Sequence, residues 1–200
     1  DNVLKTQDII CVDKSQESLD RIAKAYQVVC SAEMSAIKDC DVVLLAVKPQ
    51  NMDEVLPSMG KVISEKTLII SIAVGITSRF IVKNLGISSA AVVRAMPNTP
   101  ALLGMGMTAF AAAPAVGIAD VRKVENLINS TGRAVFLEDE ALIDAVPGLS
   151  GSGPAYFFYL IKSMIDAGIA MGFDPAMSAL LVKQTMLGSY HLMQTSDKSL

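Results

Sequence analysis

The stretch from Gly148 to Phe158, GLSGSGPAYFF, gathers residue types that a ligand-binding loop needs. Three glycines and two serines precede a proline and a run of aromatic residues. A glycine-rich loop that leads into a helix presents backbone N–H groups, which bind phosphate at the positive end of the helix dipole. Glycines also allow two backbones, or a backbone and a small ligand, to approach closely. The stretch therefore indicates either phosphate binding or close packing around a small substrate.

Four further groups of small or polar residues lie where apolar runs end. They are Asp13-Lys14, Ala46-Val47-Lys48-Pro49, Ala73-Val74-Gly75 and Met96-Pro97-Asn98-Thr99. In an open parallel sheet, ligands bind beyond the carboxyl ends of the strands. Each group alone is an ordinary strand end, but four of them in succession predict a site for a flat ligand.

The first of these groups, Asp13-Lys14, is compatible with either NAD or NADP as the cofactor. An acid at the end of a Rossmann strand typically bonds the ribose of NAD, whereas a neighbouring Lys or Ser holds the extra phosphate of NADP. Asp13 and Lys14 offer both. Taken alone, Asp13 is more often a turn residue in front of a helix.

The elements that must position these groups alternate along the chain. Apolar runs predict strands at 7–13, 28–30, 41–49, 67–75, 90–96, 107–113 and 133–139. Helical spacing of apolar residues predicts helices at 14–27, 31–40, 51–63, 77–86 and 118–132. Because the strands are apolar on both faces, the pattern predicts an α/β fold with a Rossmann-type, mainly parallel sheet covered by helices on both sides.

Several local signals accompany these helices. Ser15 or Ser18 is expected to cap the first, and Thr77 to cap the fourth, which Gly86 ends. The helix at 51–63 is expected to break near Pro57 and Gly60.

The strand signal ends at Asp139. Residues 140–173 and 174–194 predict helices that are apolar almost all round, and two such helices cannot cover one another without further helices or a partner chain. We therefore expect a Rossmann-like domain at 1–139 and an all-helical dimerisation domain at 140–200.

Three residues in the first helical stretch carry local predictions. Pro147 predicts a kink. Ser152 as a cap and Pro154 in the first turn predict where the main helix begins.

Composition and charge exclude several classes of protein. The formal net charge is -3 with no cluster of Lys and Arg, so we expect no nucleic-acid partner. No run reaches the ~18 apolar residues of a membrane span, and the first ten residues are unlike a signal peptide. The three cysteines show no CxxC spacing, which indicates reduced thiols in a cytoplasmic protein. The single histidine, His191, argues against a metal site and against a Ser-His-Asp triad.

Four motifs in one register resemble the pyrroline-5-carboxylate reductase family. They are LLAVKPQ at 44–50, SIAVGIT at 71–77, RAMPNTP at 94–100 and LSGSGPAYFF at 149–158. DAGIAMGF and QTMLGS follow, so the resemblance covers nearly the whole chain. That family reduces the cyclic imine 1-pyrroline-5-carboxylate to L-proline with NADPH or NADH, in the last step of proline biosynthesis. It joins a Rossmann domain to a helical domain that interlocks with a second subunit.

The resemblance implies a role for each group of residues. The residues implied at the dinucleotide are Asp13, Lys14, Ala46, Val47, Lys48, Pro49, Ala73, Val74, Gly75 and Asn98. The residues implied at the substrate are Met96, Pro97, Asn98, Thr99, Ser150, Gly151 and Ser152. The glycine-rich stretch is then the entry to the helical domain and the floor of the substrate site, not the phosphate loop. No catalytic residue is assigned, because no pair of carboxylates and no histidine is placed to act as an acid.

The family pattern extends beyond both ends of this sequence. A glycine loop for the pyrophosphate belongs ahead of Asp13, and an SPGGTT-like substrate loop belongs after Leu200. Neither occurs in these 200 residues, so we expect this stretch by itself to bind dinucleotide weakly and to turn over little. Glu33 stands where many members have Asn, and this second acid leaves the choice between NADPH and NADH open.

Two other functions remain as alternatives. A β-hydroxyacid dehydrogenase would use a lysine of the long interdomain helix, and Lys162 offers one without the usual GxxGxxxK phrase. A non-catalytic regulator would keep the fold and only bind or dimerise. In either case the apolar helices predict assembly, and we expect a homodimer, with stacking into higher oligomers left open.

Overall fold

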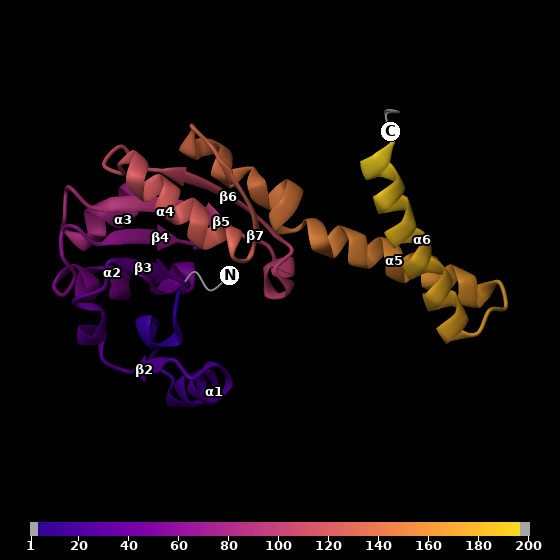
Figure 1. The fold of residues 1–200 in the computed structure, drawn as a ribbon, viewed down its shortest axis with the longest axis horizontal. Helices are drawn as coiled ribbons and strands as arrows, with labels where there is room; N and C mark the ends of the chain where they lie inside the picture. Colours follow the sequence, from indigo (N-terminus) through magenta and orange to yellow (C-terminus); the bar gives the residue numbers. More distant parts are fainter. Residues whose placement is uncertain (1–3, 197–200) are drawn as a thin grey trace. The chain divides into compact units, whose positions relative to one another are not determined.

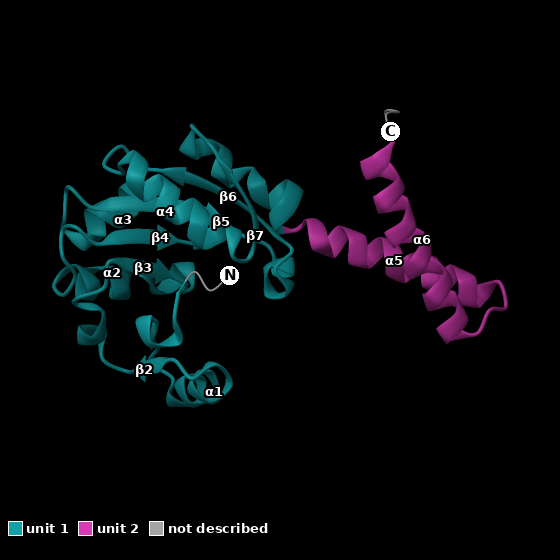
Figure 2. Ribbon diagram, in the orientation of Figure 1, with its two compact units in different colours: residues 1–151 teal, residues 152–200 magenta. Residues whose placement is uncertain are grey.

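The protein divides into two compact units in a computed structural model that describes residues 4–196. The units are Asp1–Gly151 and Ser152–Leu200, coloured teal and magenta in Figure 2. Every strand of the described residues lies in the first unit, and the second unit consists of two helices. Residues 140–151 belong to the first unit, and the domain boundary expected at Asp139 stays a prediction.

A five-stranded sheet forms the centre of the first unit (Figure 1). Its strands, in spatial order, are β3 (Val42–Leu45), β4 (Leu68–Ser71), β5 (Ala91–Met96), β6 (Gly106–Ala112) and β7 (Gly132–Phe136). β3, β4 and β5 are mutually parallel, β6 is antiparallel to β5, and β7 is parallel to β6. The prediction of a mainly parallel sheet is confirmed. The residues that follow β3, β4 and β5 consequently share one edge of the sheet.

A separate pair of parallel strands precedes this sheet. It consists of β1 (Ile10–Val12) and β2 (Val29–Ser31), joined by helix α1 (Gln16–Tyr26). No backbone ladder joins the pair to the larger sheet, and Figure 1 shows β2 and α1 set apart from it. The first strand is shorter than predicted, because Thr6–Asp8 winds into a 3-10 turn.

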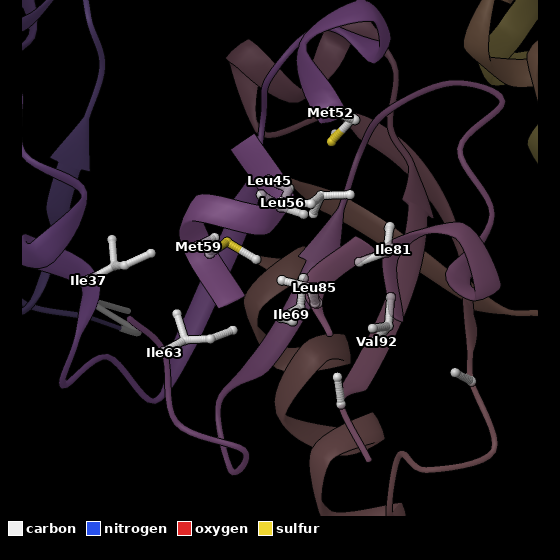
Figure 3. Packing of buried hydrophobic residues seen from close by; sticks show 12 residues of the cluster. Ile37, Leu45, Met52, Leu56, Met59, Ile63, Ile69, Ile81, Leu85 and Val92 are labelled. Carbon is white, nitrogen blue, oxygen red and sulfur yellow. The ribbon is translucent and has the colours of Figure 1, made fainter. Parts of the chain in front are cut away.

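Helices cover both faces of the sheet, as its apolar strands require. One face packs against α2 (Met52–Gly60) and α3 (Ser78–Leu85), and the other against α4 (Ile118–Asn129). Buried side chains of the first face, drawn in Figure 3, include Leu45, Leu56, Met59, Ile69, Ile81, Leu85 and Val92. Those of the second include Leu68, Ile70, Val93, Phe110 and Val124. Successive residues of β4 therefore enter opposite layers, which explains its uninterrupted apolar run.

The helix starts in the first unit mostly follow the predicted caps. Ser15, not Ser18, caps α1, because its hydroxyl accepts the Ser18 N–H at 3.3 Å. Thr77 caps α3 by accepting the Phe80 N–H at 3.1 Å. Gly86 ends α3 at φ +73°, in the left-handed region that glycine adopts without strain.

The break predicted at Pro57 is wrong. Pro57 lies inside α2, which continues to Gly60. The hydrogen bond that proline removes would have gone to the carbonyl of Asp53, in the first turn of this short helix. Asp53 is an exposed residue, and the helix continues past the proline despite this lost bond.

The long helix expected from residue 140 begins only at Gly153. Residues Glu140–Asp144 form a 3-10 helix, η5, and residues Pro147–Gly151 form a π-helical turn, η6. The winding changes next to Pro147, where a kink was predicted. Ile143 of η5 is buried against Ala109 and Ala111 of β6, so this segment extends the helical layer over the sheet.

The second unit is a helical hairpin, formed by α5 (Gly153–Ala170) and α6 (Pro175–Thr195). Pro154 occupies the first turn of α5 as predicted, but Ser152 at the N-cap position makes no side-chain cap bond. The cap prediction fails because Ser152 has helical backbone angles instead of the extended ones that aim a cap oxygen at the helix N–H groups. Asp174 caps α6 by accepting the N–H groups of Ala176 and Met177, each at 3.0 Å.

Gly168 of α5 and Ser178 of α6 pack against each other. Ser178 is buried, and its hydroxyl donates to the carbonyl of Ile165 at 2.8 Å. A Cβ at Gly168 would overlap that hydroxyl and lie 3.2 Å from the Ser178 Cβ. The hairpin thus depends on a glycine in the last turn of α5.

We predict opposite effects for two glycine substitutions in this unit. Gly168→Ala should lower the free energy of unfolding by about 1–2 kcal/mol, because overpacking and the lost Ser178 hydrogen bond outweigh the better helix propensity. Gly188→Ala, in α6 with no atom within 4 Å of its added Cβ, should raise it by about 0.5–1 kcal/mol. Urea denaturation followed by circular dichroism measures both. Equal effects of the two variants would contradict the packing described.

Candidate functional site

A cavity of about 210 Å³ lies at the edge of the sheet where β4 and β5 end. Its lining residues are Ala73, Val74, Gly75, Arg94, Ala95, Met96, Ile143, Asp144 and Pro147. One wall is the turn after β4, the base is the end of β5, and the other wall is η5 with the residues that follow it. Three segments far apart in the sequence therefore enclose one space.

The turn after β4 presents backbone to the cavity. Ala73 donates its N–H to the Ser71 hydroxyl at 3.3 Å, which turns the chain away from the strand. Gly75 has φ +73°, and a Cβ added to it would meet no atom within 4 Å, so this point of the wall is open. A flat ligand can therefore approach the backbone without meeting a side chain.

Asn98 ties the end of β5 to the glycine-rich stretch. Its amide nitrogen donates to the Ser150 carbonyl at 3.0 Å, and its amide oxygen accepts the Met107 N–H at 2.9 Å. A Cβ at Gly151 would lie 2.8 Å from the methyl group of Met96, so a side chain there would require the end of the Met96 side chain to shift. The substrate-floor residues implied by the sequence are thus held against the strand end that they were expected to face.

Arg94 is the buried charge of this site. It is 3% exposed, and its two terminal nitrogens reach Glu140 at 3.1 Å and Asp144 at 2.7 Å. Its Nε has no hydrogen-bond partner. Glu140 also accepts the backbone N–H of Ser78 at 2.8 Å and a short hydrogen bond from the Ser78 hydroxyl. One cation thus connects β5, η5 and the first residue of α3.

Hydrogen bonding sets the ionisation of Glu140. Burial alone would raise its pKa, but the two hydrogen bonds from Ser78, together with the Arg94 guanidinium, outweigh burial. The pKa of Glu140 therefore lies below its ordinary value of 4.5. A carboxyl group with a lower pKa in the folded state stabilises the fold above its unfolded pKa, and this contribution disappears as the pH falls through the folded value.

We predict that acid stability depends on Glu140. The unfolding free energy of the wild type should fall as the pH drops below 4.5, and Glu140→Gln should flatten that fall while lowering stability at neutral pH. Urea titrations at a series of pH values measure the slope. Glu125→Gln, on an exposed position of α4, is the control and should follow the wild type. Parallel pH curves for wild type and Glu140→Gln would contradict the assigned coupling.

The structure brings together part of the predicted site. Ala73, Val74, Gly75 and Met96 line the cavity, and Asn98 bonds to Ser150 beside it. Residues 46–49 follow β3 at the same edge of the sheet, and residues 97–99 follow β5. The cavity lining does not include these two groups.

Asp13 and Lys14 follow β1, in the strand pair outside the main sheet. The Asp13 carboxylate accepts the Ser15 N–H at 2.8 Å, so one of its oxygens serves the turn before α1. Ser152 belongs to the second unit and is exposed. The ligand roles of all these residues stay predictions.

Sequence reasoning missed the charged residues of the site. Arg94 is the only charge within the apolar strand AVVRAM, and a lone charge in a strand buried on both faces is a signal for a buried ion pair. Its partners Glu140 and Asp144 lie four residues apart in a segment predicted to be an ordinary helix. Nothing in the spacing indicates that this segment returns to β5.

Other kinds of site find no support within residues 4–196. No group of three or more His, Cys, Asp and Glu side chains is placed to hold a metal ion. No described helix is long and apolar enough to cross a membrane. His191 is exposed, and the three cysteines are unpaired thiols.

Two family models match the chain. One, described as pyrroline-5-carboxylate reductase dimerisation, matches residues 140–200. The other, described as NADP oxidoreductase coenzyme F420-dependent, matches residues 2–75.

Individual proteins match over most of the chain. The pyrroline-5-carboxylate reductase of Pseudomonas aeruginosa is 39% identical over 186 residues, which are 92% of this chain and 68% of that protein. A pyrroline-5-carboxylate reductase of Coxiella burnetii matches in structure with a TM-score of 0.90 and 32% identity, over 99% of this chain and 74% of that chain. A Plasmodium falciparum pyrroline carboxylate reductase, solved with NADP bound, has a TM-score of 0.88 and 29% identity over 98% of this chain and 72% of that one.

Proposed function

Because the chain belongs to the pyrroline-5-carboxylate reductase family, we propose that it reduces 1-pyrroline-5-carboxylate to L-proline with NADPH or NADH. The dinucleotide supplies a hydride to the carbon of the C=N bond, and the nitrogen keeps the electron pair of that bond and takes up one proton. The family assignment removes the β-hydroxyacid dehydrogenase alternative. Lys162, its candidate base, is an exposed residue paired with Asp166 at 2.5 Å.

The observation that carries this proposal is the cavity at the ends of β4 and β5. Small side chains and Gly75, which has open space beside its Cα, form one wall, so a flat ring fits against the backbone there. Apolar side chains, among them Met96 and Ile143, line much of the rest and would exclude water from the transfer. These features fit the nicotinamide half of a dinucleotide.

We assign the predicted residues to two parts of the site. Residues 46–49 and 73–75 would hold the dinucleotide along the shared strand edge, with Asp13 and Lys14 towards its adenosine end. Residues 96–99 and 150–152 would form the substrate side. Both bonds of Asn98 go to the protein backbone, so we give it the role of positioning Ser150 and not of contacting the ligand directly.

Imine-dependent loss of NADPH absorbance tests the function. We expect loss only when both NADPH and 1-pyrroline-5-carboxylate are present, with an equal amount of L-proline in the product mixture. Replacing the imine by L-proline in the same assay should give no loss, since that compound has no C=N bond to reduce. Loss of NADPH without proline formation, or no binding of either NADPH or NADH in calorimetry, would overturn the proposal.

The helical unit supports the proposal of a homodimer. Large apolar side chains remain exposed on both of its helices, among them Phe157, Phe158, Leu160, Met164, Leu180, Leu181, Leu187 and Leu192. Soluble proteins rarely leave so extensive an apolar surface uncovered, and the dimerisation model matches this same region. Eleven methionines in the chain add side chains that adapt their packing. We propose that a second copy of this chain covers these helices.

We further propose a cytoplasmic location. Cys11, Cys30 and Cys40 are all free thiols, which fits a reducing compartment.

A further inference from the structure

Arg94 is placed to control the distance between the two walls of the cavity. It lies in the base, at the end of β5, and is itself one of the lining residues. Its two ion pairs go to Glu140 and Asp144, at the start and the end of η5. Because Ile143 and Asp144 line the cavity, these bonds fix the second wall to the base.

The same network reaches the first wall. Glu140 bonds to both the backbone N–H and the hydroxyl of Ser78, which is the first residue of α3. Ser78 follows the wall turn at 73–75 by only three residues. Each wall is thus connected to Arg94, one directly and the other through a single carboxylate.

The chemistry of the side chain suits this task. A guanidinium is a rigid planar fork that can hold two carboxylates at once in fixed directions, whereas a lysine ammonium is a single point charge on a flexible stem. Arg94 is 3% exposed, while Glu140 and Asp144 are 28% and 57% exposed. The carboxylates are therefore hydrated in part and would move towards water if the buried cation no longer held them.

We propose that Arg94 is a positioning residue that sets the width of this cavity and thereby its affinity for the flat nicotinamide ring of a dinucleotide. This role rests on the proposed function, because it names the ring as the group that the two walls enclose. This role is distinct from a contribution to the overall stability of the fold, because it affects the affinity for only one end of a long ligand.

Two ligands separate positioning from general stability. NADPH carries the nicotinamide, and 2′-phospho-ADP-ribose carries the same adenosine half without it. In calorimetry, Arg94→Lys should weaken NADPH binding about tenfold and change the affinity for 2′-phospho-ADP-ribose less than about twofold, because only one hydrogen-bonded arm is lost. Asp144→Asn, a substitution at a half-exposed position, should also weaken the binding of NADPH more than that of 2′-phospho-ADP-ribose, but less strongly than Arg94→Lys.

Hydrogen exchange provides a readout that needs no ligand. The amides of Ala145 and Gly148 bond to the carbonyls of Leu142 and Ala145 in the second wall. They should exchange about tenfold faster in Arg94→Lys, whereas the Ala113 amide, bonded to Val92 in the core, should not change. Lys123→Met, which breaks the exposed Lys123–Asp120 pair, is the control and should alter neither measurement.

The outcomes distinguish this role from the proposed function. An equal loss of affinity for both ligands, or unchanged exchange at Ala145 and Gly148, would overturn the role of Arg94 while the dinucleotide site stands. Absence of binding of both NADPH and NADH by the folded wild-type chain would remove the dinucleotide site, and the role of Arg94 with it.

Discussion

Replacing Gly132 with alanine is expected to lower the free energy of unfolding by at least about 3 kcal/mol and to displace β7 from the sheet. Gly132 has φ +148°, which a residue with a Cβ adopts only under strain. It also pairs with Gly106 in the register of β6 and β7, and an added Cβ would overlap the Gly106 backbone. The clash involves main-chain atoms, which cannot move away by a change of rotamer as the end of a side chain could.

Urea denaturation measures this effect, and Gly117→Ala is the matched control. Gly117 has φ −78° and no atom within 4 Å of an added Cβ, but it is the N-cap of α4, where alanine is a poorer residue, so its substitution should lower stability by no more than about 1 kcal/mol. The displacement of β7 should also reach the site, because Met107 follows Gly106 and bonds to Asn98. A Gly132→Ala variant as stable as Gly117→Ala would show that the β6–β7 register is different from the one described.

Placing two carboxylates on α6 is expected to convert the proposed homodimer into a monomer. Leu180 and Leu187 are 63% and 51% exposed and lie seven residues apart, on one face of the helix. If a second copy covers this face, Leu180→Glu with Leu187→Glu would bury four charges across the interface. Such burial should weaken association at least about 1000-fold, because an unpaired buried charge is far more unfavourable than a lost leucine contact.

Sedimentation velocity at micromolar concentration measures the change. The control variant, Ser35→Glu with Ser89→Glu, adds the same charge at exposed positions of the first unit and should remain a dimer. A wild-type chain that sediments as a monomer would contradict the dimer proposal. A dimeric Leu180→Glu, Leu187→Glu variant would place the interface elsewhere.

The central strands could be predicted because their pattern has a direct physical cause. β4 is buried along its whole length, and Leu68, Ile69 and Ile70 enter the α4 layer and the α2–α3 layer alternately, so these successive positions must be apolar. Local hydrogen bonds likewise explain why Thr77 and Gly86 mark the bounds of α3 correctly. These features depend on residues close together in sequence.

The segment from Glu140 to Gly151 could not be predicted in the same way. Its composition is typical of a helix, yet it forms short 3-10 and π turns. Its contacts explain the difference, because Arg94 and Asn98 hold it from positions 46 to 52 residues away in the sequence. Helix propensity is weak compared with such tertiary interactions. The second wall of the cavity was missed for this reason.

Residues 73–75 line the cavity, as small residues after a parallel strand are expected to do at that edge of a sheet, and their ligand role stays a prediction. The failure at Ser152 was also local, because a cap residue needs extended backbone angles that the residue type alone does not guarantee. Residue type therefore indicated one wall of the cavity, whereas the opposite wall depended on the long-range fold.

The separation of β1 and β2 from the larger sheet has a consequence for the motions of the protein. No ladder couples the two sheets, so we expect the strand pair with α1 to open at a lower free energy than the five-stranded core. Asp13 and Lys14 belong to this segment. Occupation of the adenosine end would then damp its local opening, and part of the binding energy would be used to order it. The affinity for a dinucleotide would accordingly report on the rigidity of residues 10–31 as well as on the contacts they make.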